Sequence, residues 1–118
     1  MNKVFTLSTC DTSKKILKVS GISKDYFNIK DIKTEPITED ELNEMKTLAG
    51  SFEALFSRRA QKYKSMGLRD KSLSEKDYKR LILQEYTFLR RPVIIIGAEI
   101  FIGNTKKNVE TLLLFLNQ

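Results

Sequence analysis

The chain has 118 residues, of which 41% are hydrophobic and 31% are charged, a composition typical of a soluble folded domain and unlike that of a disordered segment. Its single cysteine excludes an intramolecular disulfide, and the absence of histidine excludes the usual zinc centres and Ser-His-Asp catalysis. The net charge of +6 suits an anionic partner, whether a small oxyanion, an acidic protein or nucleic acid.

The apolar stretches of the sequence are too short to form a membrane-spanning helix or the core of a signal peptide. The N-terminal stretch is too polar for the core of a signal peptide, and the longest later run, residues 93–96, cannot cross a bilayer. We therefore expect a cytoplasmic protein without a membrane partner. The basic residues are spread along the chain without an aromatic-basic ladder or a recognisable recognition helix, so we expect no direct binding of nucleic acid.

The first part of the chain shows the pattern strand, helix, strand. Residues 4–7 form a short apolar run that predicts a strand, and small polar residues follow it. Apolar positions recur at helical spacing in residues 13–19, and Gly21 is a typical helix stop. Residues 26–32 are rich in strand-forming side chains. Because a helix connects the two predicted strands, we expect them to pair in parallel.

The middle of the chain has the pattern of an inserted helical segment. Thr38 and Glu41 have the spacing of a capping box, and apolar residues then recur at three-residue intervals until Gly50. The spacing of apolar residues stays helical from residue 51 to residue 86. We therefore expect helices over about residues 38–88.

The last part of the chain predicts a hairpin followed by a helix. Residues 93–96 and 99–102 are apolar runs, and the Gly97-Ala98 pair between them suits a type II′ turn. Thr105 is a suitable N-cap for a helix that continues to the C-terminus.

These elements together predict an α/β fold. The strand–helix–strand unit requires parallel pairing, whereas the hairpin requires antiparallel pairing, so the sheet should have four strands and be mixed. A thioredoxin-like fold meets both requirements. We expect a single domain over residues 1–118, with the helical segment inserted into it.

Cys10 is the only candidate for a reactive group. It lies between the first predicted strand and helix, where free backbone N–H groups and the helix dipole stabilise a thiolate and bind an oxyanion. Lys14 and Lys15 add positive charge, while Asp11 opposes it. We expect a partly accessible thiol with a lowered pKa. The alternative is an inert cysteine that acts only as a small apolar side chain.

Three segments, Cys10-Asp11-Thr12-Ser13, residues 54–59 and residues 89–94, resemble those of the glutaredoxin-coupled arsenate reductases and their Spx-type relatives, the ArsC/Spx-like family. Cys10-Asp11-Thr12-Ser13 is similar to the Cys-x-Thr-Ser loop of the reductases, and residues 89–94 look like the Arg-Pro segment that leads into the third strand. Residues 54–59 are similar to the helical segment that carries a further substrate arginine. The similarity extends over nearly the whole chain.

The resemblance implies roles for individual residues around Cys10. Cys10 would be the nucleophile, and Arg91 would bind the oxyanion through bidentate hydrogen bonds. Ser13 would hydrogen-bond the thiolate, although it could also be an ordinary residue of the first helical turn. Thr12 and a cis Pro92 would shape the site, which requires Arg91 and Cys10 to lie close together.

The resemblance is incomplete for the other arginines of the family. In an ungapped comparison the first family arginine falls on Ser57, so Arg58 or Arg59 would have to replace it. The third arginine has no counterpart, because Ile102-Gly103-Asn104 stands at that place, as in the Spx-like members.

The resemblance therefore implies two functions of different classes. One is an arsenate-reductase-type oxidoreductase without a bound cofactor, in which Cys10 attacks arsenate, glutathione attacks the adduct and glutaredoxin removes the mixed disulfide. The other is a non-enzymatic, Spx-type transcriptional regulator that binds RNA polymerase. Ser13 replaces the second cysteine of the Spx redox pair, which leaves glutathionylation of Cys10 as the remaining redox response. An orphan family member acting on another thiol adduct is a third alternative.

Overall fold

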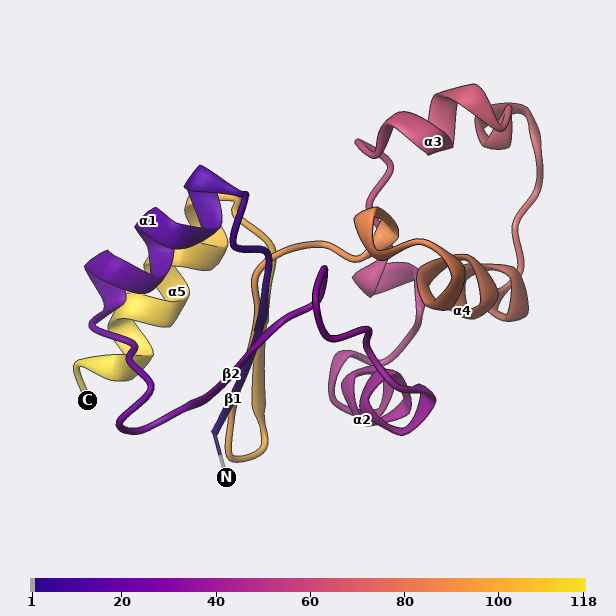
Figure 1. Cartoon of the computed structure of the whole chain (residues 1–118). Coiled ribbons are helices and arrows are strands. Elements are labelled where there is room, and N and C mark those ends of the chain that lie inside the picture. The colour runs from indigo at the N-terminus through magenta and orange to yellow at the C-terminus, as the bar shows by residue number, and fades with distance from the viewer. Residues whose placement is uncertain (1) are drawn as a thin grey trace. The chain divides into compact units, whose positions relative to one another are not determined.

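The computed structural model describes residues 2–118, which fall into two compact units. The first unit comprises residues 2–35 and Arg91–Gln118, and the second comprises Pro36–Arg90 (Figure 1). The second unit contains the predicted helical segment of residues 38–88. None of the helices within residues 2–118 combines the length and the apolar character that crossing a membrane requires.

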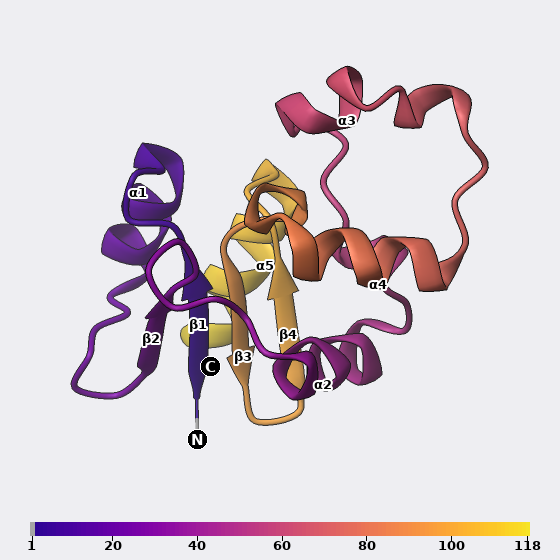
Figure 2. The same ribbon diagram turned by 45° about the vertical axis from the view of Figure 1, so that its right-hand side comes forward.

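The first unit is built on a mixed sheet. Strands β1 (Lys3–Thr6), β2 (Asn28–Asp31), β3 (Val93–Ile96) and β4 (Glu99–Ile102) lie in the order β2-β1-β3-β4 (Figure 2). β1 is parallel to β2 and antiparallel to β3, and β3 is antiparallel to β4. The predicted four-stranded mixed sheet is confirmed.

The β3–β4 connection is the predicted two-residue hairpin. Ile96 pairs with Glu99, so Gly97 and Ala98 are the central residues of the turn. Gly97 has a φ of 61°, and no residue other than glycine among residues 2–118 has a positive φ. A positive φ at the first central position alone is the signature of a type II′ turn.

Helices α1 (Asp11–Ser20) and α5 (Lys106–Leu116) pack side by side on one face of this sheet (Figure 1). Between helices and sheet lies a hydrophobic core whose buried members are Val4, Ile16, Ile22, Ile94, Phe101 and Leu112. Each fully buried aliphatic side chain of this kind stabilises a fold by roughly 1.5–3 kcal/mol. This packing holds the N-terminus of α1 at the end of β1.

Three elements of the first unit differ from their predicted bounds. β1 spans Lys3–Thr6 rather than residues 4–7, because Leu7 belongs to the turn in which its carbonyl accepts from the Cys10 N–H. α1 begins at Asp11 rather than at residue 13, because Cys10 acts as its N-cap and the Cys10 carbonyl accepts a hydrogen bond from the Lys14 N–H at 3.1 Å. β2 begins at Asn28 rather than at residue 26. The N–H groups of Tyr26 and Phe27 donate to the Ser23 carbonyl at 3.3 and 3.1 Å, which forms a turn in place of the first two strand residues.

The second unit consists of short helices. α2 (Glu39–Ala49), α3 (Gln61–Ser65) and α4 (Glu75–Gln84) are joined by segments that contain single 3₁₀ turns. The predicted capping box is present, with the Glu41 N–H donating to Thr38 Oγ1 at 3.1 Å and the Thr38 N–H to Glu41 Oε1 at 2.9 Å. The helical pattern predicted over residues 51–86 is thus interrupted, since the apolar residues there form local turns rather than one long helix.

An aromatic cluster fills the centre of the second unit. The Phe56 ring stacks on Phe88 at a centroid distance of 5.0 Å and contacts Tyr78 at 4.9 Å and Tyr63 at 6.1 Å. Beside the cluster, the Ser57 N–H donates to the Phe88 carbonyl at 2.7 Å. The middle of the inserted segment, at Phe56 and Ser57, is therefore tied to its end at Phe88.

Candidate active site

The loop that carries Cys10 is held at the carboxyl ends of two parallel strands. Thr6, at the end of β1, pairs with Asp31, at the end of β2. The Ser8 N–H donates to Asp31 Oδ1 at 3.4 Å, and the Cys10 N–H donates to the Leu7 carbonyl at 2.9 Å. These contacts close the turn that presents Cys10 at the N-terminus of α1.

Asp31 is a supporting residue that the sequence analysis missed. Hydrogen bonds from the Ser8 side chain, and then from the backbone of Lys33 and Ser8, lower the pKa of the Asp31 carboxyl, and the charge of Lys33 adds to them. The carboxylate therefore stays ionised while it holds the loop. The parallel pairing predicted for the first two strands was the available signal, because the residues that follow parallel strands meet at one edge of the sheet.

Ser13 is in direct contact with the candidate nucleophile. Its Oγ donates a hydrogen bond to Cys10 Sγ at 3.2 Å, and Ser13 is fully buried at 0% exposure. Cys10 itself is half-buried. The spacing of three residues within the first turn of α1 directs the Ser13 hydroxyl back toward the N-cap position. Of the two interpretations of Ser13, the structure supports the one in which its hydroxyl bonds the sulfur.

The surroundings of Cys10 favour its thiolate. Burial raises the pKa of the thiol, but the Ser13 hydroxyl, the Ser13 backbone N–H, the Arg91 charge and the Thr12 backbone N–H together outweigh burial and lower it. The direction agrees with the sequence-based expectation, and the backbone contribution comes from the helix N-terminus as expected. Ser13 and Arg91 supply the rest, rather than the neighbouring Lys14 and Lys15 named from the sequence.

Arg91 belongs to the same unit as Cys10 and acts on it electrostatically. Its side chain is half-buried, and the bond between Arg91 and Pro92 is cis, as predicted. The Gly103 N–H donates to the Pro92 carbonyl at 2.9 Å, which ties the segment before β3 to the residue after β4. Cys10, Thr12, Ser13 and Arg91 are therefore brought together in the first unit.

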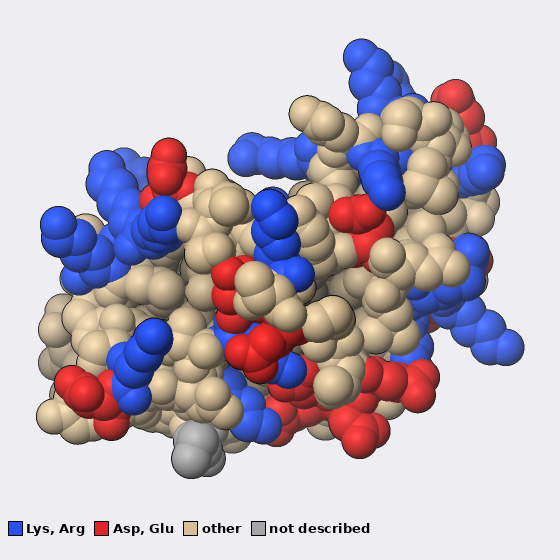
Figure 3. All heavy atoms as spheres, viewed as in Figure 1, with Lys and Arg blue, Asp and Glu red and all other residues tan. Residues whose placement is uncertain are grey.

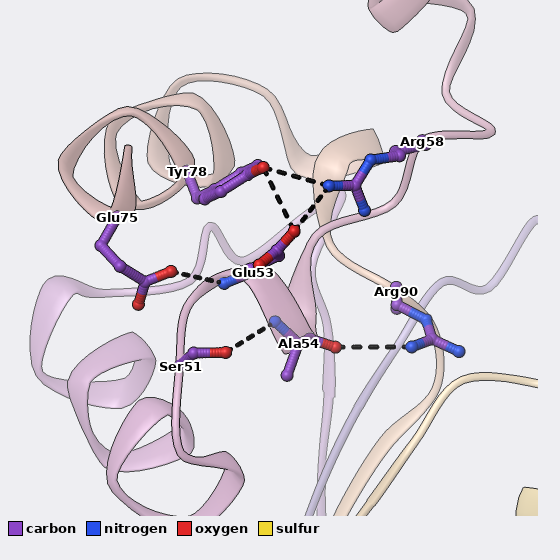
Figure 4. Close-up of polar contacts among 7 residues, drawn as sticks. All are labelled: Ser51, Glu53, Ala54, Arg58, Glu75, Tyr78 and Arg90. Carbon is purple, nitrogen blue, oxygen red and sulfur yellow. Dashed lines mark hydrogen bonds and ion pairs between the residues drawn. The ribbon is translucent and has the colours of Figure 1, made fainter. Parts of the chain in front are cut away.

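Arg58 and Arg59 lie in the second unit, and their environments differ. Arg58 Nη2 is 2.9 Å from Glu53 Oε2 and donates to the Tyr78 hydroxyl at 3.0 Å (Figure 4). The Glu53 hydrogen bond, with smaller contributions from Tyr78 and Tyr63, raises the pKa of Arg58. Arg59 is exposed, and within residues 2–118 its guanidinium makes no hydrogen bond or ion pair.

The Arg58 network is fixed by backbone contacts around Glu53. The N–H groups of Phe52 and Glu53 donate to the two carboxylate oxygens of Glu75 at 2.7 and 3.0 Å. Figure 4 also shows Arg90 directed to the carbonyl of Ala54, with Nη1 at 3.5 Å from the oxygen. Arg58 and Arg90 thus have structural partners, which leaves Arg59 as the arginine of this segment that is available to an external anion.

Potential metal ligands are not clustered in the described part of the chain. Residues 2–118 contain no group of three or more Cys, Asp or Glu side chains placed to hold a metal ion.

Comparisons with known proteins point to one family. The model of the ArsC family matches residues 5–112. A comparison with curated protein sequences gives no significant match. Among solved structures, the arsenate reductase from Vibrio cholerae superposes with a TM-score of 0.75 at 16% identity, covering 96% of this chain and 95% of that one.

Two further structures show the same likeness. A candidate arsenate reductase from Yersinia pestis has a TM-score of 0.75 at 18% identity and covers 94% of this chain and 99% of its own. An arsenate reductase (ArsC) related protein from Brucella melitensis has a TM-score of 0.68 at 20% identity, covering 93% and 92%. At these identities the likeness concerns the fold, and it confirms the predicted thioredoxin-like α/β architecture.

Proposed function

This chain belongs to the ArsC family, and we propose that it is an arsenate-reductase-type thiol oxidoreductase with Cys10 as its nucleophile. The observation that carries the proposal is the hydrogen bond from the buried Ser13 hydroxyl to Cys10 Sγ, formed beside the charge of Arg91. A hydroxyl donor, helix N–H groups and a guanidinium favour both a thiolate and a bound oxyanion.

The first step is attack of the Cys10 thiolate on arsenate. A bond forms between Sγ and arsenic, and one arsenate oxygen leaves as water after protonation. Arg91 would bind the remaining oxygens, because a planar guanidinium can give two parallel hydrogen bonds to a tetrahedral oxyanion. The backbone N–H groups of Thr12 and Ser13 lie at the same helix end and would share the negative charge.

The second step requires thiols from outside the chain, because Cys10 is its only cysteine. A thiolate such as that of glutathione attacks the adduct, a disulfide forms with Cys10, and the electron pair of the cleaved sulfur–arsenic bond leaves with arsenite. A second thiol, supplied by glutaredoxin, then takes the glutathionyl group and restores the Cys10 thiolate. In total, two thiols are oxidised and As(V) is reduced to As(III).

The chain offers a bound oxyanion fewer arginines than the family pattern has. Arg91 is the arginine of the unit that contains Cys10, whereas Arg58, in the second unit, is engaged by Glu53 and Tyr78. Gly103 occupies the region of the third and is bound through its N–H to the Pro92 carbonyl. We therefore propose arsenate binding with fewer arginines, and correspondingly a high KM for arsenate.

The test is turnover of arsenate with glutathione and glutaredoxin. We expect arsenite formation by the wild type, and none above the enzyme-free rate by Cys10→Ser. Ser72→Ala, at an exposed serine remote in sequence from the site, is the matched control and should retain wild-type turnover. Equal rates for the wild type and Cys10→Ser would contradict the enzymatic proposal and favour the Spx-type alternative, in which the chain binds RNA polymerase.

A further inference from the structure

The solvent side of α1 carries a row of lysines that continues from Cys10. Lys14 and Lys18 follow Cys10 at intervals of four residues, so they lie on the same side of the helix as the N-cap. Lys15 lies next to them, and all three lysines are exposed. We call Lys14, Lys15 and Lys18 the lysine row. The proposed mechanism uses none of them.

The lysine row is not neutralised by the protein. Within residues 2–118, none of its ammonium groups forms an ion pair or a hydrogen bond. The second unit is different, because several of its basic side chains are paired with carboxylates there: Arg58 with Glu53, Lys62 with Glu85, Lys79 with Glu39, and Arg80 with Asp77. Figure 3 shows blue Lys and Arg side chains gathered over α1.

The length of the row indicates the size of its partner. Lys18 lies eight residues beyond Cys10, which corresponds to about 12 Å along a helix that rises 1.5 Å per residue. This exceeds the Debye length of about 8 Å at physiological ionic strength, so Lys18 contributes little to an anion bound at Sγ. Val19, beside Lys18, is 55% exposed and adds an apolar contact. A small oxyanion cannot use such a surface, whereas a protein can.

We propose that the lysine row docks an acidic protein thiol, which is thereby guided to Cys10. The proposal rests on the proposed function, since it names the surface that receives the reducing protein of that cycle. Negative charges around the partner's thiol would complement the lysines, and such complementarity mainly accelerates encounter between the proteins.

The step that docking promotes is a thiol–disulfide exchange. The partner's thiolate attacks the glutathione sulfur of the Cys10–glutathione disulfide. A new disulfide forms between the partner and glutathione, the Cys10–glutathione bond breaks, and Cys10 leaves as a thiolate. No additional oxidant or reductant is required. The lowered pKa of Cys10 makes it a good leaving group in this exchange.

The experiment uses the full chain, glutathionylated at Cys10 with glutathione disulfide, and contains no arsenate. The rate of glutathione removal is measured with a glutaredoxin of net negative charge and, separately, with the small thiol β-mercaptoethanol, which has no protein surface that could dock on the lysine row. For Lys14→Glu/Lys18→Glu we expect a rate constant with glutaredoxin lower by on the order of tenfold at low salt, and an unchanged rate with β-mercaptoethanol. The wild-type rate with glutaredoxin should fall as salt is added.

Lys71→Glu/Lys76→Glu is the matched control, because it makes the same change in net charge at two exposed lysines of the second unit. It should retain the wild-type rate with both thiols. An equal loss in both double variants, or a loss with β-mercaptoethanol as large as that with glutaredoxin, would overturn the docking proposal. Because the experiment contains no arsenate, its result does not depend on arsenate turnover. The docking proposal and the proposed function can therefore be refuted independently of each other.

Discussion

The Ser13 hydroxyl lies 3.2 Å from the sulfur of Cys10 and donates to it from a completely buried position under the first turn of α1. A buried hydroxyl has no water to bond in place of the sulfur, so the donor stays directed at the thiolate. The same turn offers the backbone N–H groups of Thr12 and Ser13, and Arg91 adds a positive charge. The thiolate is therefore stabilised by groups that are already in place before any substrate binds.

Alkylation of Cys10 tests this arrangement directly. The rate of reaction with iodoacetamide should rise with pH around a midpoint below the free-thiol value of about 8.5. Ser13→Ala should move the midpoint upward, and should slow alkylation at pH 7 by roughly fivefold, the equivalent of about 1 kcal/mol for a lost hydrogen bond. Ser20→Ala, in the last turn of α1, is the control and should behave as the wild type. A midpoint at or above 8.5 in the wild type would contradict the prediction.

The lowered pKa of Cys10 also predicts how stability depends on pH. The pKa of the thiol is lower in the folded chain than in the unfolded chain, so ionisation stabilises the folded state. The contribution is complete above the unfolded pKa and is lost as the pH falls through the folded pKa. The difference in free energy of unfolding between wild type and Cys10→Ser should therefore grow in favour of the wild type from pH 6 to pH 9. Urea titrations at both pH values measure it, and a pH-independent difference would refute the linkage.

We expect Arg91 to stabilise the Cys10 thiolate through its positive charge and to bind the oxyanion through paired hydrogen bonds from its planar guanidinium. Arg91→Met removes both, so it should raise the alkylation midpoint of Cys10 and lower kcat/KM for arsenate by on the order of 100-fold. Arg91→Lys keeps the charge but loses the planar fork, and should preserve the midpoint while retaining the defect in arsenate turnover. Full turnover by Arg91→Met would show that the guanidinium has no part in oxyanion binding.

We expect Arg58 to contribute to the stability of the fold and Arg59, which is exposed, to contribute nothing to it. Arg58→Ala removes the contacts with Glu53 and Tyr78 and should lower the free energy of unfolding by about 1 kcal/mol, a modest effect because the pair is partly exposed. Arg59→Ala removes no guanidinium contact within residues 2–118 and should leave stability unchanged. Urea unfolding of the two variants makes the comparison. Loss of stability in Arg59→Ala, with none in Arg58→Ala, would reverse the assignment.

The capping box of α2 should contribute measurably to stability. Thr38→Ala leaves the Glu41 N–H without its side-chain acceptor, and should destabilise the protein by about 1 kcal/mol in urea unfolding. Thr47→Ala is the matched control, because Thr47 lies exposed within the same helix and alanine is the better helix former. The control should be as stable as the wild type or slightly more stable. Equal destabilisation by both substitutions would argue against a specific role of the cap.

Interactions between residues close together in the sequence were sufficient to predict most elements of the fold. Thr38 and Glu41 are three residues apart, and the turn at Gly97 involves two central residues, so the interactions that form them lie within a few positions of one another. The connections then predicted the pairing of two pairs of strands: β1 and β2, joined through a helix, are parallel, and β3 and β4, joined by a hairpin, are antiparallel. The boundary errors at Asp11 and Asn28 have different causes: the polar residues Asp11 and Thr12 form the first turn of α1 after the Cys10 cap, whereas a turn at Ser23 takes the place of the first two predicted residues of β2.

The position of Cys10 at the start of a helix, the capping box and the hairpin could be predicted, because each depends on neighbours along the chain. Which distant groups act together depends instead on how the strands and helices pack. Arg91 meets Cys10 because β3 pairs with β1, Asp31 holds Ser8 because β2 pairs with β1, and Arg58 is engaged by Glu53 and Tyr78. Such contacts depend on how strands and helices pack, and side-chain type and spacing along the chain do not specify them.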